Sequence, residues 1–346
     1  MLPVRVVAVT TTHLPGWIEL DGVDNMRDVG GLPTRDGGAV AAGRLIRSDN
    51  LQELTPASVR HLVDDLGVTD VVDLRTFVEV AKEGDGPLLA EPGIHVHHHT
   101  LYTEDTKESG IPAGERRLPW ESDRNMGTAA KVRRPKKRSH GETGPSPGSA
   151  KRSHGETGPS PGSEKRSHGE TGPSPGSEKR SHGETGPSPG SAKEDRKHDA
   201  YWSKHYLGYL DQRPDSVVAA LRAIGEADGA VVVHCAAGKD RTGTVVGLAL
   251  LVAGVTPEAV VADYAASAER VPRILERLAR HPAYAANLAG KTVAQQEPRA
   301  ETMRLLVEAL DREGGAEAWL HQHGWTDEDT EFLRAKLLRS PELSAQ

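Results

Sequence analysis

The chain has 346 residues, a formal net charge of −7 and a single cysteine. The negative charge argues against a generally basic nucleic-acid-binding protein, and one cysteine excludes an internal disulfide framework and a multi-cysteine zinc site. The apolar run at residues 1–9 is too short for a secretory signal, and the longest one, residues 245–255, is far below a membrane span. These features predict a cytoplasmic protein without an integral membrane segment, in a reducing compartment where a free thiol survives.

The order of the predicted elements indicates one α/β domain, a mostly parallel sheet flanked by helices. We expect a lead-in at residues 1–16, a first part of the domain at residues 17–128, an insertion at residues 129–196 and a second part at residues 197–340. The elements predicted in the first part are a strand from Trp17, a turn over residues 25–31, a strand at Leu45 and Ile46, a helix from Pro56 to Leu66 and a buried strand over residues 68–74.

Two pairs of charged residues lie close to these strands. Arg27 and Asp28 belong to the turn, and we interpret them as structural, hydrogen-bonding residues. Arg75 and Glu79 follow the strand over residues 68–74, and ligands gather at the carboxyl ends of parallel strands. We therefore expect Arg75 and Glu79 to support a functional site, with an ordinary surface ion pair as the alternative.

The next predicted strand, residues 94–99, contains alternating histidines. His95, His97 and His99 would share one face of the strand. Three imidazoles on one face suit zinc or iron, but no acidic cluster or second histidine pair accompanies them. We therefore favour an edge strand near the rim of a site and expect no bound metal.

A repeat interrupts the domain. Residues 137–192 contain four copies of a fourteen-residue unit, Lys-Arg-Ser-His-Gly-Glu-Thr-Gly-Pro-Ser-Pro-Gly-Ser-Ala/Glu. The unit has almost no apolar residue, so it cannot form a core or a solenoid. We predict a disordered, passive insertion; a docking or phosphorylation tract is the alternative.

The second part of the domain is expected to be mainly helical. Trp202, Tyr206 and Tyr209 recur at helical spacing, and we interpret this face as core more than as a platform for a substrate. The other predicted elements are a strand at residues 231–233 and helices over residues 215–227, 244–253, 257–264, 270–280, 301–310 and 327–338.

A loop pattern follows the strand at residues 231–233. Cys235, Arg241 and Thr242 form Cys-x5-Arg-Thr at the start of a helix, where loop amides and the helix N-terminus favour an anion. Such a place also favours the thiolate, the nucleophilic form of cysteine, and arginine binds phosphate through two donors. We predict Cys235 as nucleophile, His234 and Thr242 as supporting residues, and a phosphate-binding loop made of Ala236, Ala237, Gly238, Lys239, Asp240 and Arg241.

Other interpretations of this loop explain less. A lone cysteine is often inert core, and a nucleotide-binding Walker loop needs Ser or Thr where Asp240 stands. A phosphate-binding module without catalysis would not need Cys235, Arg241 and Thr242 together. A redox sensor is a further possibility, but with one cysteine it could form no internal disulfide.

The loop, residues 234–243, resembles the signature of cysteine-dependent phosphatases. Its Ala-Gly-Lys-Asp-Arg-Thr-Gly form is similar to that of the bacterial tyrosine and lipid phosphatase family, which includes mycobacterial members. Further matches lie at residues 25–31, 43–48, 73–75 with Glu79, and 261–264. The resemblance implies the cysteine-phosphatase fold, a phosphocysteine intermediate and no cofactor.

The same resemblance implies a general acid on a loop after the strand at residues 94–99. Residues 101–123 would form a mobile lid, and Asp105 is the favoured acid, with Glu104 beside it, although direct counting points to Thr103. Asp240 is the second candidate, because some lipid phosphatases carry an acid before the arginine. Its structural alternative is a pair with a nearby base that holds the loop.

The substrate implied by the resemblance is a phosphotyrosine protein. A phosphoinositide, or dual specificity, is the alternative. Lys239 would suit a polyanionic headgroup, whereas Ala236 lacks the extra base of some lipid phosphatases. Export without a signal peptide stays open, because some relatives act outside the cell.

Overall fold

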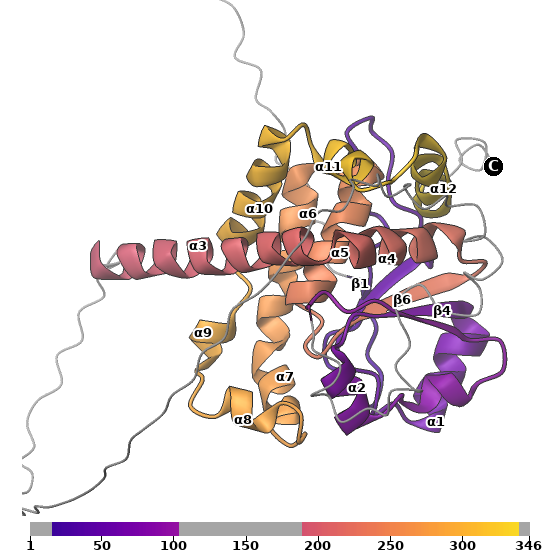
Figure 1. The fold of residues 1–346 in the computed structure, drawn as a ribbon. Helices are drawn as coiled ribbons and strands as arrows, with labels where there is room; N and C mark the ends of the chain where they lie inside the picture. The colour runs from indigo at the N-terminus through magenta and orange to yellow at the C-terminus, as the bar shows by residue number, and fades with distance from the viewer. Residues whose placement is uncertain (1–15, 104–188, 339–346) are drawn as a thin grey trace, which may run out of the picture. The chain divides into compact units, whose positions relative to one another are not determined.

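The computed structural model describes residues 16–103 and 189–338 (Figure 1). Its strands are β1 (Gly16–Trp17), β2 (Arg27–Asp28), β3 (Leu45–Ser48), β4 (Val68–Asp73), β5 (His95–His98) and β6 (Ala230–His234). They form one sheet in the order β1-β2-β3-β6-β4-β5. The strands from β3 to β5 in this order are parallel, and β1 and β2 add an antiparallel edge. The predicted mostly parallel sheet is confirmed.

Strand β6 lies at the centre of the sheet and is buried along its whole length. Val231 and Val233 belong to one hydrophobic cluster, whereas Ala230 and Val232 belong to another. Because side chains alternate between the two faces of a strand, these clusters cover opposite faces of the sheet. An apolar run such as this one is typical of a parallel strand that is covered on both sides.

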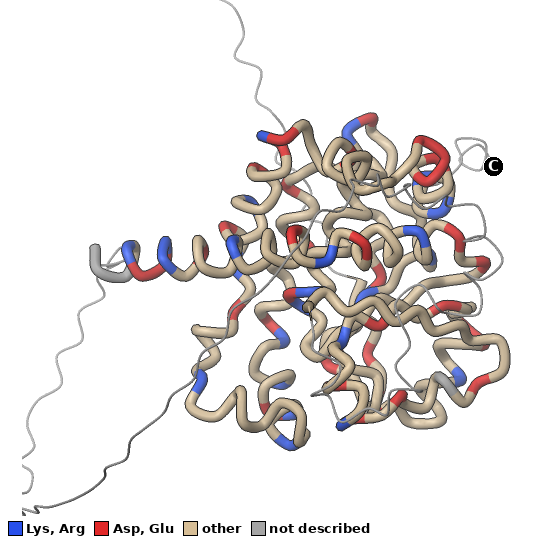
Figure 2. The backbone as a smooth tube through the Cα atoms, viewed as in Figure 1, with Lys and Arg blue, Asp and Glu red and all other residues tan. Residues whose placement is uncertain are grey.

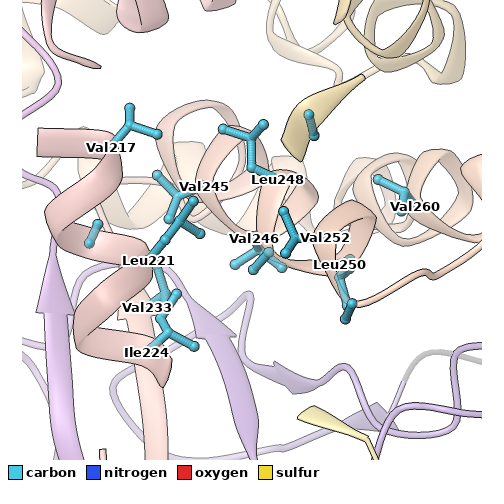
Figure 3. Close-up of a cluster of buried hydrophobic side chains, with 14 of the residues drawn as sticks. Val217, Leu221, Ile224, Val233, Val245, Val246, Leu248, Leu250, Val252 and Val260 are labelled. Atoms are coloured by element: carbon cyan, nitrogen blue, oxygen red, sulfur yellow. The ribbon is translucent and has the colours of Figure 1, made fainter. Parts of the chain in front are cut away.

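Helices cover both faces. The cluster of Val231 and Val233 is completed by side chains of α3 (Pro189–Gln212), α4 (Pro214–Glu226), α5 (Asp240–Val252), α6 (Pro257–Ala266), α10 (Ala300–Arg312), α11 (Ala316–Gln322) and α12 (Asp327–Leu337). Figure 3 shows Leu221 and Ile224 of α4 beside Val233. The opposite cluster contains residues of α1 (Pro56–Arg60), a π-helical turn (His61–Asp65) and a 3-10 turn (Pro87–Ala90). The remaining helical segments are α2 (Phe77–Glu83), a 3-10 turn (Ser267–Arg270), α7 (Val271–Leu278), α8 (Ala285–Leu288) and α9 (Val293–Gln296).

Some predicted boundaries differ from those in the structure. Helix α3 begins at Pro189, inside the predicted insertion, because proline fits the first turn of a helix and good helix formers follow it. Acidic and basic residues are interleaved along its N-terminal half (Figure 2). Helix α5 begins at Asp240, ahead of the predicted start at Thr244, so Arg241 lies in its first turn. The helix predicted from Pro56 to Leu66 changes to π-helical geometry after α1.

Helices α2, α8, α9 and α11 were not predicted. For α2 the sequence does contain a signal, because Thr76 and Glu79 form a capping box: the Thr76 hydroxyl accepts from the Glu79 amide at 3.1 Å, and Glu79 accepts from the Thr76 amide at 2.6 Å. Among residues 16–103 and 189–338, no helix is long and apolar enough to cross a membrane. Glu104, Asp105, most of the expected lid and nearly all of the repeat lie outside the described residues.

Candidate active site

The predicted phosphate loop, residues 235–241, follows β6 and includes the first two residues of α5. Cys235 follows the last residue of β6 and is 2% exposed. It lies at a cavity of about 440 Å³, to which residues of five segments of the chain contribute. The cavity is lined by Thr76, Val78, Glu79, Lys82, Tyr102, Trp202, His205, Tyr209, Cys235, Ala236, Ala237, Lys239, Asp240, Arg241, Leu275, Leu278, Ala283, Tyr284, Asn287, Leu288 and Gln296. The structure therefore places Cys235 and Arg241 at one cavity.

The carbonyl groups of the phosphate loop are bound to the surrounding scaffold. The oxygen of Ala236 accepts from the Asn50 amide at 3.0 Å, and the oxygen of Ala237 accepts from Asn25 Nδ2 at 2.9 Å. The oxygen of Gly238 accepts from Arg47 Nη2 at 2.8 Å. Because these three carbonyls are turned toward the scaffold, the loop presents its amide side to an anion.

Gly238 is required by the tight path of the loop. Its φ is +67°, and a Cβ at this position would lie 2.5 Å from the carbonyl group of Ser48. Any side chain would therefore clash with the backbone of the strand end, in a conformation that L-residues avoid.

Two buried arginines and one carboxylate support the loop on the side of its carbonyl groups. Asp263 of α6 accepts from Arg27 Nε at 2.8 Å and from Arg47 Nη1 at 2.5 Å. Arg27 also donates to Asn25 Oδ1 at 2.9 Å. Burial and the neighbouring Arg47 lower the pKa of Arg27 to about 10 against the attraction of Asp263, so it stays charged at neutral pH. We name Asn25, Arg27, Arg47 and Asp263 the supporting network; the structural role expected for Arg27 is consistent with it.

Arg241 is fixed at the cavity by Glu79. Its two terminal nitrogens donate to the two carboxylate oxygens at 2.6 and 2.8 Å, and one of them also donates to the Leu74 carbonyl at 3.1 Å. Burial alone would lower the pKa of Arg241, but the Glu79 carboxylate outweighs it and raises that pKa well above its usual value. The same pair lowers the pKa of Glu79 despite burial of the carboxyl group. Both groups are thus charged in the folded protein.

Arg75 and His234 contact the site indirectly. Arg75 Nη2 and Nε bind the Asp73 carboxylate at 2.6 and 3.0 Å, at the end of β4. His234 Nε2 lies 3.6 Å from the same carboxylate, and its Nδ1 is 3.3 Å from the Cys235 carbonyl oxygen. Burial lowers the pKa of His234 to about 4, although Asp73 opposes the shift. A neutral His234 therefore links the end of β4 to the phosphate loop.

Asp240 and Lys239 pair with each other at the cavity. Lys239 Nζ lies 3.1 Å from Asp240 Oδ2 and 5.0 Å from the centroid of the Trp202 ring. The Tyr206 hydroxyl donates to Asp240 Oδ1 at 2.5 Å. Each carboxylate oxygen thus has a donor, which matches the pairing considered for Asp240 as the alternative to an acid. Thr242 Oγ1 is buried without a hydrogen-bond partner among the described residues.

Two walls of the cavity were not identified from the sequence. The aromatic wall consists of Tyr102, Trp202, His205 and Tyr209, in which the Tyr102 hydroxyl bonds His205 at 3.2 Å and Tyr209 at 3.1 Å. The apolar wall comes from α7, α8 and the segment between them, and consists of Leu275, Leu278, Ala283, Tyr284 and Leu288. The helical spacing of Trp202, Tyr206 and Tyr209 was the available signal. It led us to expect core, which holds for Tyr206 and Tyr209, both buried in the cluster that contains Val231 and Val233. Tyr209 and the partly buried Trp202 also line the cavity.

Two of the histidines of β5 have hydrogen-bond partners in the protein. His97 Nε2 lies 2.8 Å from Asp70 Oδ1, and His98 Nε2 lies 2.7 Å from the Arg75 carbonyl oxygen. His97 and His99 stack with ring centroids 6.4 Å apart, so they share a face as predicted. β5 is also the edge strand expected from the sequence. In the part of the chain that the structure describes, no group of three or more His, Cys, Asp or Glu residues is arranged to hold a metal ion.

Comparisons with known proteins agree on one family. A sequence model described as the tyrosine phosphatase family matches residues 18–339. The chain is 30% identical over 264 residues to the triple specificity protein phosphatase PtpB of Mycobacterium tuberculosis (strain ATCC 25618 / H37Rv). The aligned region covers 75% of this chain and 72% of that protein. It is also 35% identical over 122 residues to a tyrosine-protein phosphatase of Nostoc commune, and this aligned region covers 34% of this chain and 42% of that protein. The region matched by the family model includes the phosphate loop, Glu79 and both cavity walls.

Proposed function

The chain belongs to the tyrosine phosphatase family and is a phosphoric monoester hydrolase, and from this premise we propose that it acts through a phosphocysteine intermediate on Cys235. The observation that carries the proposal is the shared cavity: Cys235 lies beside Arg241, whose guanidinium is oriented by Glu79. A thiolate nucleophile and a bidentate phosphate ligand are the two groups that this chemistry needs.

In the first step, the Cys235 thiolate attacks phosphorus and forms an S–P bond while the ester P–O bond breaks. The leaving oxygen takes its proton from the general acid. In the second step, the oxygen of a water molecule attacks phosphorus while one proton of that water passes to the same carboxylate; the S–P bond breaks, and phosphate and the Cys235 thiolate are released. Arg241 and the loop amides bind the phosphoryl oxygens throughout. The Thr242 hydroxyl, which has no hydrogen-bond partner among the residues that the structure describes, would donate to the departing thiolate.

We assign the general acid to Asp105, with Asp240 as the alternative. Asp240 lines the cavity, but its two oxygens already accept from Tyr206 and Lys239, an arrangement that suits an anchor. Asp105 lies outside the described residues, three positions after Tyr102 of the aromatic wall. A leaving-group series on Asp105→Asn and Asp240→Asn separates the two assignments: the variant of the true acid loses more activity on poor leaving groups than on p-nitrophenolate.

Phosphotyrosine in a protein is the proposed main substrate. The aromatic and apolar walls suit the ring of an aryl phosphate. A phosphoinositide or dual specificity is the second candidate, because the mycobacterial relative is named a triple specificity phosphatase. Lys239, expected to serve a polyanionic headgroup, is instead paired with Asp240 and lies over Trp202, which favours the peptide substrate.

Turnover of a panel of phosphotyrosine peptides and phosphoinositide vesicles tests this function. We expect hydrolysis of the peptides, its loss in Cys235→Ser, and retention of phosphate binding by that variant. Wild-type turnover by Cys235→Ser would contradict the covalent mechanism, and a thousandfold preference for the lipid would reverse the order of the substrates. We also propose a cytoplasmic location, because the one cysteine must stay reduced to react; fractionation of producing cells tests it.

A further inference from the structure

A chain of hydroxyl groups ends on the phosphate loop. The Tyr264 hydroxyl of α6 lies 2.7 Å from the Tyr206 hydroxyl of α3, and the Tyr206 hydroxyl donates to Asp240 Oδ1 at 2.5 Å. Tyr206 and Tyr264 are each 1% exposed. Water is therefore largely excluded from the two phenols, and each depends on protein groups for its hydrogen bonds.

The direction of these hydrogen bonds follows from the chemistry of the groups. Burial, followed by the nearby Asp240 carboxylate, raises the pKa of Tyr206 and that of Tyr264 well above the usual value, so both remain protonated. A carboxylate only accepts, so the single proton of Tyr206 points to Asp240. Tyr264 must then donate to the oxygen of Tyr206. The donors run in one direction, from Tyr264 through Tyr206 to Asp240.

The other oxygen of Asp240 has its own restraint. Lys239 Nζ lies 3.1 Å from Oδ2 and is itself held over the Trp202 ring. The Asp240 carboxylate is thus bound on both oxygens, by Tyr206 of α3 and by Lys239 of the phosphate loop. An unrestrained carboxylate at the same cavity would place a negative charge where the substrate phosphate binds.

We propose that Tyr206 is a positioning residue of the reaction, which acts through Asp240 and is itself oriented by Tyr264. This inference rests on the proposed function, because it assigns the role of Tyr206 in the same site. Its hydroxyl holds the Asp240 carboxylate against the wall of the cavity and away from the phosphoryl group. Simple core packing would instead require only the aromatic ring of Tyr206.

A double-mutant cycle on Tyr206→Phe and Asp240→Ala tests the proposal, because the cycle isolates the term that two residues share. Phenylalanine keeps the ring and removes only the hydroxyl. We expect Tyr206→Phe to lower kcat/KM for p-nitrophenyl phosphate about tenfold, as for loss of a hydrogen bond to a charged group. In the Asp240→Ala background the same change should alter kcat/KM by less than about twofold, since its acceptor is gone.

Tyr209→Phe is the matched control. Tyr209 is also buried on α3, but its hydroxyl bonds Tyr102 and not Asp240. Its effect should therefore be the same in the wild type and in Asp240→Ala. Tyr264→Phe should act in the same direction as Tyr206→Phe, more weakly, and should add nothing in the Tyr206→Phe background. Equal losses from Tyr206→Phe in both backgrounds, or equal coupling for Tyr209, would overturn the proposal.

Binding of inorganic phosphate separates this proposal from the proposed function. The same cycle is measured as the dissociation constant for phosphate by thermal shift, which needs no turnover. Coupling in phosphate binding without any turnover by the wild type would reject the function and keep the role of Tyr206. An active wild type without coupling in either measurement would reject the role of Tyr206 alone. If Tyr206→Phe does not fold, Tyr264→Phe is used with Asp240→Ala, and additivity there counts against the proposal.

Discussion

Behind the phosphate loop, the supporting network of Asn25, Arg27, Arg47 and Asp263 is buried and paired by short hydrogen bonds, whereas the cavity walls carry mainly aromatic and apolar groups. A buried ionic network has few alternative arrangements, because each unpaired charge is costly. Aromatic and aliphatic side chains accept more variation in shape. We therefore expect the network to hold the phosphate loop in one conformation and the walls to determine which substrate fits.

Removal of the Asp263 carboxylate, which Arg27 and Arg47 share, should cause the largest loss of stability. Asp263→Asn leaves Arg27 and Arg47 buried without their counter-charge, and loss of one partner of a buried pair costs about 3–5 kcal/mol. We expect that decrease in the free energy of unfolding in urea. The matched control is Asp215→Asn, which breaks the more exposed pair with Arg213 and should cost less than about 1 kcal/mol. Equal losses would show that burial of the network is unimportant.

His234 provides a test of the supporting side by pH. Its pKa is about 4 in the folded protein and about 6.5 when unfolded, so the unfolded chain binds the proton more readily. The contribution of neutral His234 to the free energy of unfolding is complete above about pH 6.5. As the pH falls from 6.5 through 4, the free energy of unfolding decreases by roughly 3 kcal/mol. Unfolding free energies of the wild type and His234→Gln should therefore differ in slope across this interval. Parallel slopes would contradict a neutral, buried His234.

Glu79 lies where the two regions meet. Glu79→Gln removes the charge that fixes Arg241, and we expect kcat/KM to fall about 100-fold, as for a charge-assisted hydrogen bond. Glutamine also completes a capping box, so α2 should persist. The control Thr76→Ala removes the cap, keeps the carboxylate, and should cost about 1 kcal/mol of stability with a much smaller loss of activity. The reverse ranking would make Glu79 a helix cap and no more.

A change in the aromatic wall should have a smaller effect and a different signature. Trp202→Leu removes the ring beneath Lys239, and we expect KM for p-nitrophenyl phosphate to rise about threefold with kcat nearly unchanged. Tyr201→Leu is the control, because Tyr201 is 64% exposed and does not line the cavity. A fall in kcat as large as that of Glu79→Gln would mean that the wall also positions the reacting groups.

Deletion of the repeat should have the smallest effect of all. Because α3 begins at Pro189, the deletion is best placed at residues 137–188. Every core and cavity residue named above lies outside that range, and the entropy of loop closure changes slowly with loop length. Melting temperature and turnover of p-nitrophenyl phosphate should stay near the wild-type values, as they should when one copy, residues 137–150, is deleted. A loss in either measurement would show that the repeat contributes to the domain.

The difference between the two regions also explains which residues could be predicted. The phosphate loop is contiguous, so Cys235, Arg241 and the strand before them are recognisable from local spacing. Arg27 and Asp263 are 236 positions apart, and nothing in either segment specifies the partner. Trp202 and Tyr206 lie on one helix, and helical periodicity gives the face without stating whether core or cavity covers it. Glu79 was placed near a site by its strand end, but its pairing with Arg241 is a tertiary contact.

Two consecutive residues of α6 are linked, each through one intermediate side chain, to two positions of the phosphate loop. Asp263 reaches Gly238 through Arg47, and Tyr264 reaches Asp240 through Tyr206. Local unfolding of α6 would break both links together, so we expect the loop and the helix to share one opening free energy. We expect phosphate that binds the loop to raise the opening free energy of α6 as well. In amide hydrogen exchange, that linkage appears as slower exchange along α6 in proportion to phosphate saturation.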